Sequence, residues 1–96
     1  MRLPAFLFTM DVDRTKSFKE QLDRSHAWPV LYTFKFIVPK GLEEQVRSLF
    51  PKHTPTERLS KTGKYTSITV QMMMPSSDAV IEVYETAGKI EGIIAL

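Results

Sequence analysis

The clearest pattern in the chain lies between Tyr65 and Met74, where two sets of side chains alternate. One set is Tyr65, Ser67, Thr69, Gln71 and Met73, and the other is Thr66, Ile68, Val70, Met72 and Met74. A period of two predicts a β-strand with one face on a core, and the β-branched residues favour a strand over a helix. Gly63 among lysines predicts a hairpin turn before this strand, and Pro75 ends it.

A second alternation predicts another strand over residues 30–38. Its more uniformly apolar set, predicted to face the core, is Tyr32, Phe34, Phe36 and Val38. The opposite set, predicted to face away from the core, is Leu31, Thr33, Lys35 and Ile37. Residues 56–60 follow Pro55 and carry charges, which suits an edge strand, and residues 90–96 are predicted as a last strand.

Two segments between these strands have helical spacing instead. In residues 42–50 the apolar positions recur at intervals of three and four, and Pro51 ends the pattern. After Pro75, Ser76 or Ser77 is predicted to cap a second helix, whose apolar face includes Val80 and Tyr84.

The resulting order is β-α-β-β-α-β. It predicts an α+β, ferredoxin-like domain over residues 28–96, with a four-stranded antiparallel sheet and two helices on one face. Right-handed crossovers place the first and third strands in the centre of this sheet.

Residues 1–27 are predicted to be an N-terminal tail with a short helix. Phe18 and Leu22 lie four residues apart, so this helix is either a packed flank or a frayed arm. Asp13 or Thr15 could cap it, and Ser17 offers a competing start. Residues 1–9 are apolar, but Pro4 interrupts them, which favours a tail or an extension upstream of Met10 over a signal peptide.

Composition narrows the class of protein. A length of 96 residues with 43% apolar residues indicates one globular domain with a modest core. The absence of cysteine excludes disulfides, thiolate zinc sites and a cysteine nucleophile, and it fits a cytoplasmic protein. No apolar run approaches the roughly 20 residues of a membrane span.

Few residues suggest catalysis or metal binding. The two histidines, His26 and His53, have neither a second histidine nor a carboxylate at metal-ligand spacing. The paired carboxylates Glu43–Glu44, Glu82–Glu85 and Asp11–Asp13 fall on predicted helix faces or in the polar arm, where solvation is the simpler reading. We therefore expect no enzyme, no cofactor and no metal.

Several stretches together resemble the YbeD-like family, a bacterial domain of unknown function. They are the run from Ser60 through Gly63-Lys64-Tyr65 to Val70, the later Tyr84…Gly88-Lys89-Ile90, and Tyr32…Phe36 before the first helix. The resemblance covers Trp28 to Leu96. It implies a fold similar to the ACT regulatory domains of amino-acid enzymes and a regulatory role linked to lipoate or glycine-cleavage metabolism.

The open sheet face and the hairpin form the predicted binding face. Its residues are Leu31, Thr33, Lys35, Ile37, Arg58, Lys61, Gly63, Lys64, Tyr65, Ser67, Thr69, Gln71 and Met73. We expect an apolar-centred patch with polar surroundings, which is either an interface or a partly solvated sheet face.

A regulatory domain that contacts a metabolic enzyme or a small metabolite, as a homodimer, is the first functional hypothesis. The alternative is RNA binding through the basic set Arg47, Lys52, Arg58, Lys61 and Lys64, with Lys35 and the aromatic Tyr65. This alternative ranks second because the third strand of an RNA-recognition motif carries more stacking aromatics than Tyr65 alone.

Overall fold

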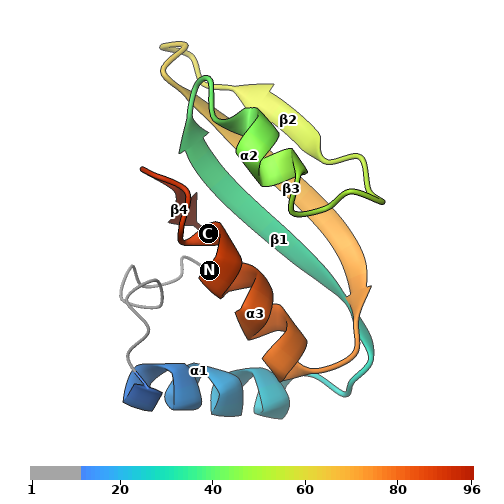
Figure 1. Cartoon of the computed structure of the whole chain (residues 1–96). Helices are drawn as coiled ribbons and strands as arrows, with labels where there is room; N and C mark the ends of the chain where they lie inside the picture. The colour runs from blue at the N-terminus through green and yellow to red at the C-terminus, as the bar shows by residue number, and fades with distance from the viewer. Residues whose placement is uncertain (1–11) are drawn as a thin grey trace.

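The two longest strands, β1 (Val30–Pro39) and β3 (Tyr65–Met74), pair antiparallel over their whole length in the computed structural model, which describes residues 12–96. With β2 (Thr56–Leu59) and β4 (Ile94–Ala95) they form a four-stranded antiparallel sheet of order β2-β3-β1-β4 (Figure 1). The predicted α+β, ferredoxin-like arrangement is confirmed, including the central position of the first and third strands.

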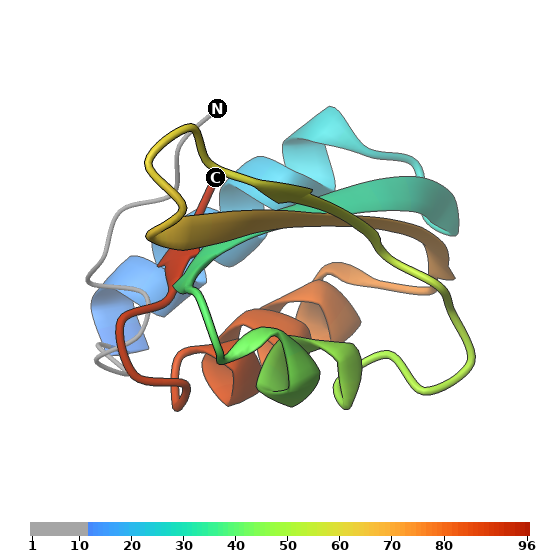
Figure 2. The same ribbon diagram turned by 90° about the horizontal axis from the view of Figure 1, so that it is seen from above.

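Two helices, α2 (Glu43–Arg47) and α3 (Ser77–Ala87), lie on one side of the sheet (Figure 2). The Ser76 side chain caps α3 by accepting a hydrogen bond from the Ala79 N–H, as predicted. The helix predicted over residues 42–50 is too long. The helix ends at Arg47. Phe50 reaches the core from the turn that follows, where its N–H bonds to Arg47 O three residues back instead of four residues back as in an α-helix.

The N-terminal helix α1 (Val12–Ser25) is a packed flank, which settles the alternative that the sequence left open. It begins at Val12, ahead of each predicted cap. Phe18 and Leu22 are buried, and the Phe18 ring centroid lies 5.8 Å from that of Tyr84 on α3. Residues 1–9, for which a tail or an upstream extension was predicted, lie outside the described residues. Within residues 12–96 no helix is long and apolar enough to cross a membrane.

The core lies between the sheet and α3, and aromatic rings dominate it. Of the four predicted core residues of β1, Phe34, Phe36 and Val38 are fully buried. The fourth, Tyr32, is only partly buried and packs against the core. The Phe34 ring centroid lies 5.4 Å from Tyr84 and 5.8 Å from Phe50, so one side chain links β1 to both covering segments. The contact with Tyr84 is edge-on and the contact with Phe50 is tilted, and aromatic pairs prefer such arrangements to direct face-to-face stacking.

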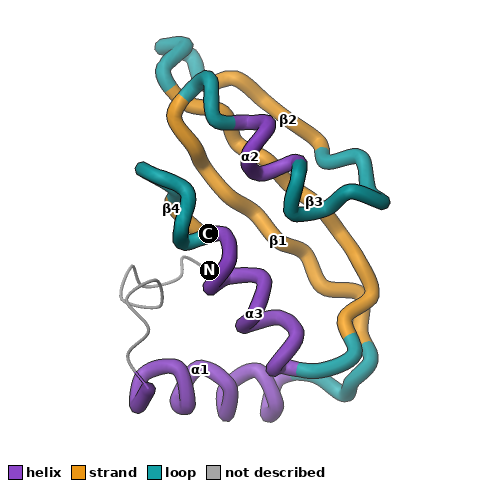
Figure 3. Tube along the Cα trace, in the orientation of Figure 1, coloured by secondary structure: helices purple, strands orange, loops and turns teal. Residues whose placement is uncertain are grey.

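The last strand is much shorter than the predicted residues 90–96. Ile90 and Ile93 are buried but belong to a turn, and Gly92 has a φ of +76° there. A Cβ on Gly92 would meet Pro39 Cγ at 2.9 Å, so the turn packs tightly on the end of β1. As a result β4 pairs with only Phe36 and Ile37 of β1 (Figure 3).

Candidate functional site

One face of the sheet is left uncovered by α2 and α3, and it carries the strand residues of the predicted binding face. Partners in the antiparallel register share a face. The register places Leu31 opposite Met73, Thr33 opposite Gln71, Lys35 opposite Thr69, and Ile37 opposite Ser67. Arg58 of β2 is opposite Ser67 and joins the same face.

The distribution of apolar residues on this open face differs from the prediction. Leu31 and Met73 are each 59% exposed and form a pair at one end. Ile37 lies towards the other end with Ile94 of β4 beside it. The middle is polar, and Gln71 Nε2 donates to Thr33 Oγ1 at 3.1 Å. The expected apolar centre with polar surroundings is therefore wrong: two apolar ends flank a polar middle.

The charged strand residues that the structure describes on the open face are both positive. Lys35 and Arg58 point to this side, whereas Glu57 alternates to the opposite side, where its Oε2 accepts a 2.6 Å hydrogen bond from Arg47 Nε. Arg47 also pairs with Glu44. Arg47, one of the basic residues considered for RNA, is therefore neutralised on the helix side and does not join the face.

The hairpin next to this face has the predicted turn. Gly63 has a φ of +74°, in the left-handed region that favours glycine, and its N–H bonds to Ser60 O at 3.0 Å. Ser60 N–H in turn bonds to Tyr65 O at 2.8 Å. Lys61 and Lys64 are exposed, and Tyr65 is 45% exposed at the start of β3. The hairpin thus extends the positive open face.

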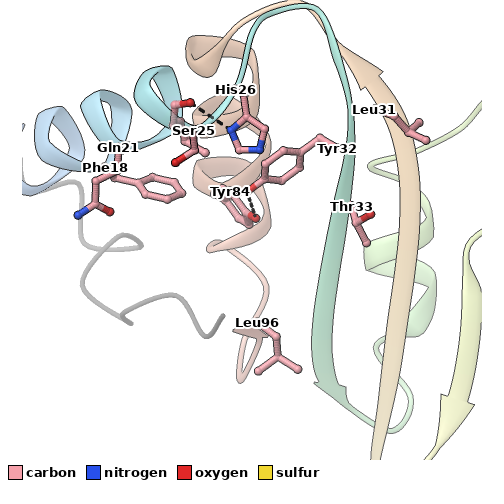
Figure 4. Close-up of a pocket in the computed structure, with 10 residues that line it drawn as sticks. Phe18, Gln21, Ser25, His26, Leu31, Tyr32, Thr33, Tyr84 and Leu96 are labelled. Carbon is pink, nitrogen blue, oxygen red and sulfur yellow. Dashed lines mark hydrogen bonds between the residues drawn. The ribbon is translucent and has the colours of Figure 1, made fainter.

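A cleft of about 370 Å³ lies between α1 and β1, and the sequence did not predict it (Figure 4). Its lining residues come from α1, the segment that follows α1, β1, α3 and the C-terminus: Phe18, Gln21, Leu22, Ser25, His26, Leu31, Tyr32, Thr33, Tyr84 and Leu96. His26 Nδ1 lies 3.1 Å from Leu22 O. The His26 ring sits beside two aromatic rings, with centroid distances of 5.2 Å to Trp28 and 5.6 Å to Tyr32.

Two tyrosine hydroxyls meet at the cleft wall. Tyr32 Oη and Tyr84 Oη are 3.0 Å apart and share a hydrogen bond (Figure 4). Burial raises the pKa of Tyr84, and the hydrogen bond to Tyr32 raises it further. Burial also raises the pKa of Tyr32, against the opposite effect of the hydrogen bond. Both phenols are neutral at physiological pH, so they suit hydrogen bonding to a bound group rather than proton abstraction.

The remaining candidate groups are dispersed. Thr66 Oγ1 donates to Glu43 Oε2 at 2.7 Å, and this bond, with the Gly41 N–H, holds the pKa of Glu43 below its usual range. Glu44 belongs to the Arg47 pair, and His53 is exposed. Asp11 lies outside the described residues. In the part of the chain that the structure describes, no group of three or more His, Asp or Glu side chains is placed to hold a metal ion.

The signal for the cleft was present in the sequence but incomplete. Phe18, Gln21, Leu22 and Ser25 recur at intervals of three and four, so they share one face of α1. The sequence near α1 does not show which part of the domain this face packs against. Its position depends on the contact of Phe18 with Tyr84, which is 66 residues further along the chain.

Comparison with known proteins gives one match. A family model described as "Protein of unknown function (DUF493)" matches residues 23–96, from the last turn of α1 to the C-terminal Leu96. No curated protein and no solved structure matches the chain.

Proposed function

Because the chain belongs to DUF493, the YbeD-like family that its sequence resembles, and because the function of that family is unknown, we propose a function from the site geometry. The protein is a small regulatory domain without catalytic activity that binds a partner protein through the open sheet face. The partner suggested by the family resemblance is a metabolic enzyme.

The observation that carries this proposal is the exposed pair of Leu31 and Met73 on the sheet face that α2 and α3 leave uncovered. Exposed apolar side chains that lie together on an uncovered sheet face cost solubility unless a partner covers them. Leu31 and Ile37 are six residues apart on one strand, about 20 Å. A small metabolite does not span that length, which favours a protein surface over a metabolite.

The charges indicate the kind of surface that fits. Lys35 lies between the apolar ends, Arg58 lies at the edge, and the described strand residues of this face include no carboxylate. A partner with two apolar patches and acidic side chains between them would be complementary. The one aromatic, Tyr65, gives little stacking surface for RNA.

Affinity capture with matched variants tests the proposal. The wild-type chain, Met73→Asp and Lys35→Glu are compared with Glu82→Lys, a control on the exposed side of α3. We expect the wild-type chain to capture a partner protein in stoichiometric amount, with or without nuclease treatment. The Glu82→Lys variant should still capture this protein, whereas Met73→Asp and Lys35→Glu should not. Retention by Met73→Asp, or loss of the captured material after nuclease, would contradict the proposal, and the latter would favour RNA.

The homodimer stays a prediction of the family resemblance. Sedimentation of the isolated chain over a range of concentrations measures it directly. A dimer that dissociates on Met73→Asp would place the second copy on the open face, whereas a dimer that persists would place it elsewhere.

A further inference from the structure

Within residues 12–96, no strand pairs with the outer edge of β1 over its first half. Leu96 N–H donates to Lys35 O at 2.8 Å, so the backbone groups of Lys35 point towards β4. Backbone direction alternates along a strand, and the N–H and C=O of Thr33 and Leu31 therefore point to the same side. Because β4 pairs with only Phe36 and Ile37, no strand among residues 12–96 meets those groups.

The cleft adjoins this free edge. Leu31 and Thr33 form one wall, and Phe18 and Leu22 of α1 contribute the apolar part of the other. Gln21, Ser25 and His26 add hydrogen-bonding groups, as Figure 4 shows. A strand edge that offers N–H and C=O groups at two-residue intervals, beside an apolar cleft, is complementary to an extended peptide.

Charge restricts the peptide further. The side chains that line the cleft include no Asp and no Glu. Lys35 follows Thr33 on the same side of β1 and is exposed, so it is the charged residue of β1 next to the unpaired part of this edge. An acidic residue in the peptide would meet Lys35, whereas a basic one would be repelled.

We propose that the β1 edge at Leu31–Thr33 and the adjoining cleft bind an extended peptide segment of a partner protein. The peptide continues the line of β4 as an added strand, places an apolar side chain in the cleft and places an acidic one beside Lys35. This inference goes beyond the proposed function, because it adds the backbone edge of β1 and the cleft and specifies a linear motif. Leu31, Thr33 and Lys35 also belong to the open face, whereas Met73 belongs to that face alone.

Phage display of random decapeptides on the full chain tests the inference. The enriched peptide is synthesised and titrated by fluorescence anisotropy. Thr33→Pro removes the outward N–H without touching the pairing with β3, whereas Thr33→Val keeps the N–H. We expect an acidic, alternating apolar peptide whose affinity falls about tenfold or more with Thr33→Pro and stays within about twofold with Thr33→Val.

Thr33→Pro could also lose binding because it folds poorly, so a second pair of variants tests the cleft without changing β1. Ser25→Trp fills the cleft from α1, while Arg24→Trp places the same side chain on a neighbouring position that does not line the cleft. We expect only Ser25→Trp to abolish peptide binding. Met73→Asp, which damages the open face, should leave peptide affinity intact, so that this inference and the proposed function can fail separately.

Amide hydrogen exchange identifies the occupant. We expect the amides of Leu31 and Thr33 to exchange freely without peptide and to be protected when peptide binds. Three results would overturn the inference: no enriched peptide, a peptide whose affinity ignores both Thr33→Pro and Ser25→Trp, or protection of the two amides before peptide is added. In the last case, protection that rises with protein concentration points to a second copy, and protection that does not points to residues 1–11.

Discussion

The two faces of β1 and β3 share one pair of strands but carry alternate residues, and they have opposite physical roles. On the helix side, Phe34, Phe36 and Ile68 are fully buried. On the open side, Leu31 and Met73 keep more than half of their surface exposed. The contacts that stabilise the fold are therefore concentrated on the helix side, so residues on the open side can be substituted without loss of the fold.

The largest effect on stability is expected for Phe34→Ala on the buried face. The Phe34 ring contacts Tyr84 and Phe50, and removing it leaves a cavity that the aromatic neighbours cannot fill. We expect a loss of about 3–5 kcal/mol in the free energy of unfolding. Since domains of this size have only about 5–15 kcal/mol in total, the variant should be close to unfolding.

Urea denaturation followed by circular dichroism measures this loss. Phe34→Leu is the matched control, because it keeps most of the apolar volume and should cost clearly less. A loss below about 1 kcal/mol for Phe34→Ala would mean that the core packs differently around β1.

A smaller effect is expected for Thr66→Val, which tests a polar contact on the buried face. Thr66 is buried and donates to Glu43, so it links β3 to the start of α2. Valine keeps the shape but removes the hydroxyl, and we expect a loss of about 1 kcal/mol in unfolding free energy. Thr66→Ser, which retains the hydroxyl, should recover part of the contact in the same denaturation experiment.

The same contact predicts a pH dependence. The Thr66 hydroxyl lowers the pKa of Glu43 in the folded chain from its ordinary value of 4.5. The carboxylate therefore stabilises the fold above that value, and this contribution is lost as the pH falls through the lower folded-state pKa. Thermal melts between neutral and acidic pH should show a smaller acid-induced drop in Tm for Thr66→Val than for the wild type. Equal drops would show that Glu43 is not the group that titrates.

The smallest effect on stability is expected on the open face. Met73→Ser should change the free energy of unfolding by no more than about 0.5 kcal/mol, because Met73 has little packing to lose. Denaturation curves that overlay those of the wild type would support the comparison. A destabilisation similar to that of Phe34→Ala would show that this face is covered in the isolated protein.

The sequence predicted those elements whose pattern is local. Alternation identified β1 and β3 almost to the residue, and Gly63 located the hairpin, because side-chain direction and turn chemistry depend on near neighbours. The order of the strands followed from the handedness of crossovers and is confirmed.

Features that depend on distant contacts were not predictable in this way. Ile90 and Ile93 are buried, but they lie in a turn before β4. The apolar pattern of residues 90–96 is the same for a buried turn as for a strand, so the sequence alone does not separate the two. The shortness of β4 and the docking of α1 together create the free edge and the cleft. Both depend on packing against Pro39 and Tyr84, far away in the sequence.

Trp28 is the sole tryptophan of the chain, and it lies where α1 meets β1. Its Nε1 donates to Asp23 Oδ1 at 3.0 Å, and its ring lies beside that of His26 at the cleft. The intrinsic fluorescence of the protein therefore comes from a single, half-buried site next to the cleft. Binding in the cleft can therefore be followed by the fluorescence of Trp28 in unlabelled protein.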